Sequence, residues 1–311
     1  MNYLNRFYRT ILSIVFLTVF QVGMAQASSG YFEGSKSDTL HLFLIGNSFS
    51  QNAGRYLPQL AQEGNHPLVI GRAEIGGCTL KKHWELAEIA EKNPDDPKGK
   101  PYQGKSLRKL LSERKWDIVT LQQYSLHSGD INTYRPYARK LYDLIKSIQP
   151  SARIVLHQTW AYRSDSKDFS LVAEEKYAKN AQEMYDQSRA AYHSTASELD
   201  VEIIPVGDAF RKVSTSKKWG YKSDDKFDFS NPDYPNLPDQ TNSLHRGYFW
   251  DKNKKMGFDS HHANEAGCFL GSLVWYSFLF GDSPEKLKFV PKEVPLDFAE
   301  YLKKVAKSVV K

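Results

Sequence analysis

The sequence predicts an α/β fold, in which helices cover both faces of a parallel β-sheet. Two observations lead to this prediction. Segments with strand character alternate along the chain with segments whose apolar residues recur at helical spacing. Several strand segments are nearly continuous apolar runs, which is typical of strands buried on both faces. Alternation of this kind implies a doubly wound sheet with right-handed crossovers.

Five segments have strand character. They are residues 40–46, 66–75, 116–123, 152–162 and 201–207. Five strands suit the flavodoxin-like order 2-1-3-4-5, with helices on both sides of the sheet in a three-layer sandwich.

The helices are predicted from apolar spacing between these strands. The first carries Tyr56, Leu57, Leu60 and Ala61 on one face and ends at Gly64. The further helical segments are two within 82–115, one around 141–148, and residues 171–198, 208–216, 264–280 and 298–310. Residues 222–255 are polar and are predicted to form a long loop, whose acidic residues lack the ligand spacing of a calcium site.

The N-terminus is predicted to be a secretory signal peptide, residues 1–27. Arg6 and Arg9 precede an apolar run from Ile11, and Ala25-Gln26-Ala27 is a small-x-small cleavage pattern. We therefore expect export to the periplasm or beyond. A flexible leader over 28–37 and a single domain over 38–311 would follow.

Charge and cysteine content exclude several classes of protein. The formal charge is +6, but Lys and Arg are scattered among Asp and Glu, so we expect no nucleic-acid partner. The apolar segment 266–280 is too short to span a membrane. Cys78 and Cys268 could pair or remain buried thiols. We expect neither a metal nor a cofactor.

The corner Gly46-Asn47-Ser48 follows the first predicted strand directly. Asn and Ser are good helix caps and Gly allows a tight turn, so a plain helix start explains it. Ser48 would also stand at the carboxyl end of a parallel strand, where open α/β folds keep their active sites. A nucleophile there needs a base from elsewhere in the chain.

Asp259 and His262 offer such a base, just before an apolar helix. A spacing of three lets the carboxylate reach the imidazole Nδ1 and leave Nε2 free to accept a proton. A helix cap and a solvated histidine would explain the same residues. The other candidate bases are His127, His157, His245 and His261, of which His261 is the nearest alternative.

These motifs resemble those of the SGNH (GDSL-like) hydrolases. Gly46-Asn47-Ser48 matches the first block of that family and Asp259-Ser260-His261-His262 the last. The resemblance implies a triad of Ser48, Asp259 and His262. It also implies an oxyanion hole made by the backbone N–H groups of Ser48 and Gly77.

The third block departs from the family pattern. Where an Asn side chain usually completes the oxyanion hole, this chain has Gln122 and Gln123. The substitution resembles one SGNH subgroup with glutamine at this position, which favours Gln122 without excluding Gln123.

The resemblance implies an exported serine esterase. We expect an acylated carbohydrate as the substrate, with acetyl as the acyl group, and we expect Asn47, Trp160 and Trp250 to contact it. Two alternatives remain, a lipid or thioester hydrolase with the same triad and a catalytically silent carbohydrate-binding protein.

Overall fold

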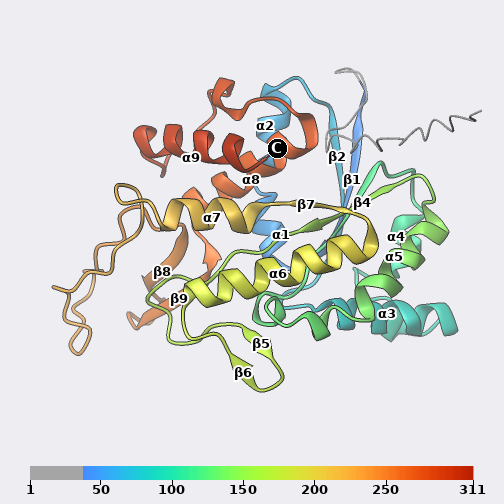
Figure 1. Ribbon diagram of the computed structural model, residues 1–311, viewed down its shortest axis with the longest axis horizontal. Coiled ribbons are helices and arrows are strands. Elements are labelled where there is room, and N and C mark those ends of the chain that lie inside the picture. The colour runs from blue at the N-terminus through green and yellow to red at the C-terminus, as the bar shows by residue number, and fades with distance from the viewer. Residues whose placement is uncertain (1–37, 311) are drawn as a thin grey trace, which may run out of the picture.

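The structure, a computed structural model, describes residues 38–310. The predicted signal peptide (1–27) and leader (28–37) lie outside the described residues, as does Lys311. Figure 1 shows the arrangement of helices around a central sheet.

The central sheet has five parallel strands in the order β2-β1-β3-β4-β7. In chain order these strands are β1 (Leu40–Gly46), β2 (Leu68–Glu74), β3 (Ile118–Leu121), β4 (Arg153–His157) and β7 (Glu202–Ile204). The predicted order 2-1-3-4-5 is therefore confirmed. The strands are shorter than predicted at several ends, because polar residues there turn out of the sheet into the loops that form the site.

Alternate residues of β1 feed two separate cores. Leu42 and Leu44 pack in the core under the C-terminal helices, whereas Phe43 and Ile45 pack in the core on the opposite face. This period of two explains why β1 is apolar at nearly every position.

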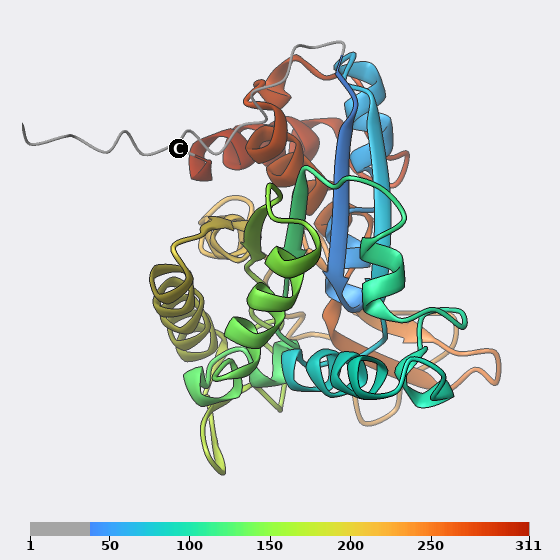
Figure 2. The same cartoon turned by 90° about the vertical axis from the view of Figure 1, so that its right-hand side faces the viewer.

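The helices divide between the two faces of the sheet. One core takes residues from α1 (Ser48–Ala53), α2 (Leu57–Glu63), α7 (Val206–Ser214), α8 (Glu265–Phe280) and α9 (Leu296–Val309). The other takes residues from α3 (Leu80–Lys92), α4 (Leu107–Leu111), α5 (Tyr137–Ile148) and most of the buried face of α6 (Ala181–Leu199). Figures 1 and 2 show α8 and α9 across the sheet from α3 to α5, so the three layers are confirmed.

Helix α8 is buried along nearly its whole length. A Cβ at Gly271 would lie 2.8 Å from the Ala53 Cα, so only glycine allows α8 to approach helix α1 so closely. Among residues 38–310, none of the helices is long and apolar enough to cross a membrane.

Two antiparallel hairpins correct the predicted elements. Residues 171–198 are not one helix, since β5 (Leu171–Ala173) and β6 (Lys176–Tyr177) precede α6. The predicted loop 222–255 includes β8 (His245–Trp250), which pairs with β9 (Met256–Ala263). Short 3₁₀ helices complete the described chain: η1 (Pro97–Gly99), η2 (Ser125–His127), η3 (Ile131–Thr133) and η4 (Pro284–Lys286).

Candidate active site

Ser48 is the first residue of α1 and directly follows the β1 strand and its N-cap, Asn47. The Asn47 backbone is extended, and its Oδ1 accepts a hydrogen bond from the Phe49 N–H at 3.0 Å. In the described chain no group accepts a hydrogen bond from the Ser48 N–H. The same corner thus starts helix α1 and leaves the Ser48 N–H without an acceptor, since the first N–H groups of a helix have no partner within it.

Ser48, His262 and Asp259 lie in line. The His262 Nε2 is 3.0 Å from Ser48 Oγ, and its Nδ1 is 2.9 Å from Asp259 Oδ2. With Nδ1–H donating to the carboxylate, Nε2 presents its lone pair to the serine hydroxyl. The arrangement can take the serine proton and stabilise the resulting imidazolium.

A β-bulge brings Asp259 and His262 together. Strand β9 pairs Asp259 with Gly247 and Ala263 with His245, so three residues of β9 face one residue of β8. The extra residues bend the strand and turn side chains that would otherwise alternate between faces. The sequence predicted only that Asp259 and His262 lie just before an apolar helix, and the structure places them in a bulged strand.

Three hydrogen bonds fix this bulged segment to the rest of the fold. The Ala263 N–H donates to Asn52 Oδ1 of α1 at 3.1 Å, which ties the strand that carries His262 directly to the helix that begins at Ser48. The Trp160 Nε1–H donates to the His261 carbonyl at 2.9 Å, and the Arg163 N–H donates to the Ser260 carbonyl at 2.9 Å. Hydrogen bonds therefore hold the backbone before and after His262.

Asp259 is held as a carboxylate. Burial raises its pKa, but hydrogen bonds from the His262 ring and the His262 N–H, and the nearby charges of His261 and His262, outweigh burial and leave the pKa well below its usual range. The His261 N–H also donates to Asp259 Oδ1, at 3.2 Å. The carboxylate can thus orient His262 without taking its proton.

Gly77 lies in the turn after β2, in a left-handed conformation with φ +64°. The turn is fastened to the serine corner, because Asn47 Nδ2 donates to the Cys78 carbonyl at 3.0 Å and the Ile75 N–H donates to the Gly46 carbonyl at 3.2 Å. The Gly77 N–H has no acceptor within residues 38–310. Two N–H groups without partners, of Ser48 and Gly77, therefore follow adjacent strands β1 and β2.

The structure corrects the prediction for Gln122. Its Nε2 donates to Asn47 Oδ1 at 2.8 Å and to the Gln123 carbonyl at 2.9 Å, while its Oε1 accepts from the Ser50 N–H at 3.1 Å. Both amide protons are used inside the protein. Gln122 therefore holds the corner around Ser48 through its bonds to Asn47 and Ser50, and it has no N–H left to donate to an oxyanion.

Gln123 is corrected for the same reason. Its Nε2 donates to the carbonyl and to the hydroxyl of Thr133, and its Oε1 accepts from the N–H groups of Leu80 and Tyr124. The side chain is buried and fixes the start of α3, which follows the Gly77 turn.

Two of the three predicted substrate contacts, Asn47 and Trp160, are also corrected. Asn47 is buried and its amide is used by the cap, by Gln122 and by the Cys78 carbonyl. Trp160 is buried between Phe49 and Phe210, with ring centroids 4.2 and 4.5 Å apart. Trp250 pairs with Met256 roughly 10 Å along the strand from Asp259 and is partly exposed, so its contact with the substrate stays a prediction.

His83 is a site residue that the sequence did not reveal. It is buried, its Nε2 donates to the Gly46 carbonyl at 3.0 Å, and its Nδ1 accepts from the Tyr102 hydroxyl at 2.8 Å. Burial lowers the pKa of His83 to about 4, although the bond to Gly46 opposes this, so the ring is neutral near pH 7. Only tertiary structure brings α3 to the end of β1, so no local pattern marks this role.

The alternative bases lie away from Ser48. His157 and His245 are buried, and the His245 Nε2 donates to the Ala161 carbonyl at 2.9 Å. His127 packs against Tyr124 after β3. His261 directs its Nδ1 toward Asp259, so it shares the carboxylate but not the serine.

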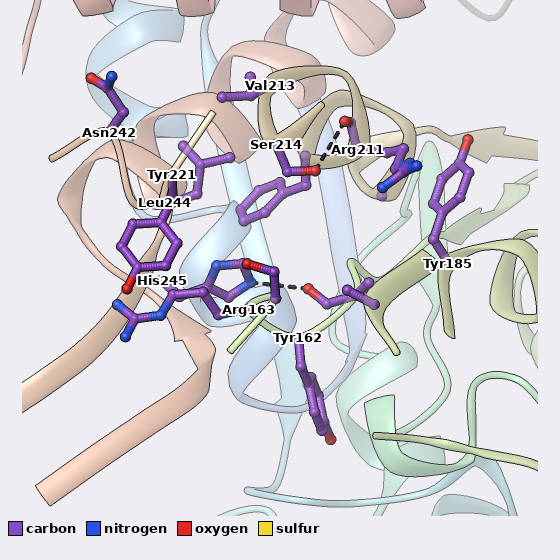
Figure 3. A pocket seen from close by; sticks show the side chains of 15 residues that line it. Tyr162, Arg163, Tyr185, Arg211, Val213, Ser214, Tyr221, Asn242, Leu244 and His245 are labelled. Carbon is purple, nitrogen blue, oxygen red and sulfur yellow. Dashed lines mark hydrogen bonds between the residues drawn. The ribbon is translucent and has the colours of Figure 1, made fainter. Parts of the chain in front are cut away.

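A mostly apolar cavity of about 90 Å³ is lined by residues outside the triad (Figure 3). Its walls include Tyr185, Phe210 and Leu244, and residues Ala161 to Arg163 form the wall shared with the bulged segment. None of Ser48, Gly77, Asp259 and His262 lines it.

Cys78 and Cys268 are buried free thiols, so the structure answers the question that the sequence left open.

Residues 41–229 match the domain of unknown function DUF4886. The chain belongs to the DUF4886 family. Among curated proteins none matches the sequence. A DUF4886 family protein from Bacteroides uniformis ATCC 8492 has a crystal structure similar to 88% of this chain and 95% of that one, with a TM-score of 0.68 and 22% identity. This DUF4886 protein therefore shares its fold with a second family member.

SGNH hydrolases are also among the structural neighbours of this DUF4886 protein. A proposed SGNH hydrolase from Slackia heliotrinireducens is 19% identical over 78% of this chain and 99% of that one, with a TM-score of 0.46. An acetyl xylan esterase is 13% identical over 77% of this chain and 98% of that one, with a TM-score of 0.44.

Proposed function

We propose that this protein is a serine ester hydrolase of the SGNH type. The observation that carries the proposal is the alignment of Ser48 Oγ, the His262 ring and the Asp259 carboxylate through contacts of 3.0 and 2.9 Å. Hydroxyl, imidazole and carboxylate in this order form the proton-handling unit of acyl transfer.

In the proposed reaction Ser48 Oγ attacks the ester carbonyl carbon while its proton moves to His262 Nε2. The tetrahedral intermediate collapses when the imidazolium returns that proton to the departing alkoxide, which leaves as an alcohol. Water then attacks the acyl-serine, His262 takes its proton, and the acid and free Ser48 are released.

The oxyanion of each tetrahedral intermediate would be bound by the N–H groups of Ser48 and Gly77. Both lack partners in the described chain, and the turn that carries Gly77 is fastened to the serine corner by Asn47. Loss of one such donor raises the activation barrier by roughly 3 kcal/mol. No glutamine donor enters this scheme, because the Gln122 and Gln123 amides are used elsewhere.

The proposed substrate is an O-acylated, and specifically O-acetylated, carbohydrate. A polar groove of about 430 Å³ reaches Gln51, one helical turn after Ser48, and is lined further by Arg72, Glu74, Gln103 and Lys105. Amide and charged groups at this density suit a ligand rich in hydroxyl groups.

The test uses Ser48→Ala with Ser50→Ala as the matched control. Ser48→Ala should abolish hydrolysis of p-nitrophenyl acetate and labelling by a fluorophosphonate while the protein stays folded. Undiminished turnover in Ser48→Ala would show that Ser48 is not the nucleophile. Failure of the unmodified, folded protein to label would instead favour the catalytically silent alternative.

Substrate class is tested separately. Acetate release from acetylated polysaccharides should exceed hydrolysis of long-chain esters, and Gln51→Ala should raise the KM for the polysaccharide but not for p-nitrophenyl acetate. A preference for long acyl chains or thioesters would favour a lipid or thioester hydrolase instead.

We also propose that the protein is exported, on the pattern of residues 1–27. N-terminal sequencing of the protein from the periplasm or medium should give Ser28 as the first residue. A mature chain that retains Met1 would contradict this.

A further inference from the structure

Two consecutive histidines direct the same ring nitrogen at one carboxylate. His262 Nδ1 lies 2.9 Å from Asp259 Oδ2, and His261 Nδ1 lies 3.3 Å from Asp259 Oδ1. The ligating atoms of all three residues lie within 4.8 Å of one another. Proton transfer needs only His262, so the proposed reaction leaves the second histidine unexplained.

The β9 bulge causes this arrangement. Neighbouring residues of a regular strand point to opposite faces, but the extra residues between Asp259 and Ala263 bring both rings to one side. The ring centroids of His261 and His262 are 4.2 Å apart. The cluster is partly exposed, with 40% of the His261 side chain and 36% of the His262 side chain accessible, so an ion can reach it from solvent.

We propose that Asp259, His261 and His262 form a binding site for Zn²⁺ that switches off the hydrolase. Two imidazole nitrogens and a carboxylate oxygen are ligands that zinc accepts, at about 2.0–2.2 Å each. In tetrahedral geometry, ligand atoms at these distances lie about 3.4 Å from one another. The two nitrogens face different oxygens of Asp259, at 2.9 and 3.3 Å, and one ligand atom from each residue lies within 4.8 Å of the others. The rings therefore need to close toward one oxygen to reach this geometry.

Inhibition follows from the tautomer of His262, and this part rests on the proposed function. Zinc binds the lone pair of Nδ1, so the single proton of the neutral ring, which this nitrogen donates to Asp259, must move to Nε2. A neutral ring then carries its proton on Nε2, which faces Ser48 Oγ at 3.0 Å. That nitrogen becomes a donor and cannot take the serine proton, so the base is lost.

Arg246 opposes the cation. Its Nη1 lies 3.9 Å from Asp259 Oδ2, and its guanidinium stacks over Phe249 at 3.8 Å from the ring centroid. The side chain is 54% exposed, so it can turn away at modest cost. Removal of its charge should strengthen zinc binding, whereas removal of His261 should weaken it.

The experiment is calorimetric titration of the untagged protein with ZnCl₂, with hydrolysis of p-nitrophenyl acetate measured in parallel. We expect one ion per chain, with at least tenfold weaker binding in His261→Gln and severalfold tighter binding in Arg246→Ala. His193→Gln, which changes an exposed histidine outside the cluster, should bind as the unmodified protein does.

Zinc should abolish hydrolysis at saturation, EDTA should restore it, and His261→Gln should require at least tenfold more zinc for half-inhibition. Absence of binding, or equal binding by His261→Gln, would overturn the site. Binding without inhibition would overturn the switch. Zinc binding through His261 in a protein that hydrolyses no ester would refute the proposed function and leave the metal site standing.

Discussion

His262 Nε2 lies 3.0 Å from Ser48 Oγ, although 214 positions separate the two residues in the chain. The serine begins a helix after the first strand, and the histidine ends a bulged strand near the C-terminus. Two hydrogen bonds hold them together. Asn52 of α1 accepts from the Ala263 N–H, and the Trp160 Nε1–H donates to the His261 carbonyl. The contact is therefore a product of the whole fold.

Asp259→Asn should lower kcat by about 10³-fold or more and leave KM nearly unchanged. An amide cannot stabilise the imidazolium and permits the wrong tautomer of His262. Steady-state kinetics with p-nitrophenyl acetate measure the effect. Ser260→Ala is the control, since that hydroxyl binds Ser166 and not the triad. Equal kinetics in the two variants would contradict the role of Asp259.

The sequence could indicate only those candidate site residues that a short local pattern marks. Ser48 is marked by a strand followed by a cap, and the pair Asp259 and His262 by its spacing before an apolar helix. Five strands could likewise be predicted, because they alternate with helical segments and because inner strands such as β1 and β3 are buried on both faces and mostly apolar.

The sequence could not show where amide and indole groups point. Gln122 faces the backbone N–H of Ser50, and Trp160 is buried by Phe49 and Phe210, which are remote in sequence. The β8–β9 hairpin was missed for a related reason. It stands outside the central sheet and is mostly half exposed, so it lacks the apolar pattern that marks a strand.

Gly77→Ala should reduce both stability and turnover. An alanine in the left-handed conformation costs about 1–2 kcal/mol in unfolding free energy, and relaxation of the turn would tilt the N–H proposed to bind the oxyanion. We expect kcat to fall by about tenfold or more. Gly76→Ala is the matched control, because its φ is not left-handed and its Cβ would meet open space. Identical losses in both variants would argue against a specific role for Gly77.

Asn52→Ala should lower kcat by about tenfold, with a loss of about 1 kcal/mol in unfolding free energy. The Ala263 N–H loses its acceptor on α1, and the segment that carries His262 is then free to shift from Ser48. Asn52→Asp keeps an oxygen acceptor and should retain most of the turnover. Kinetics and thermal unfolding of the two variants test the link, which would be refuted if alanine and aspartate behaved alike.

Acid should destabilise the fold through its buried histidines. Burial lowers the pKa of His83 to about 4, of His157 to about 3 and of His245 to about 4. These rings stay neutral in the folded protein while the unfolded chain protonates them near pH 6.5. The unfolded state therefore binds more protons below that pH.

The resulting loss of stability is largest between pH 6.5 and about 4. Each histidine contributes a slope of up to about 1.4 kcal/mol per pH unit, and above pH 6.5 the contribution is constant. Both ring nitrogens of His157 are buried without a hydrogen-bond partner in the described structure, so His157→Leu removes one proton site at little cost in contacts. Urea unfolding at pH 7.5, 6.5, 5.5 and 4.5 should show a slope that is smaller in His157→Leu, by up to about 1.4 kcal/mol per pH unit. An unchanged slope would mean that the acid sensitivity arises from other groups.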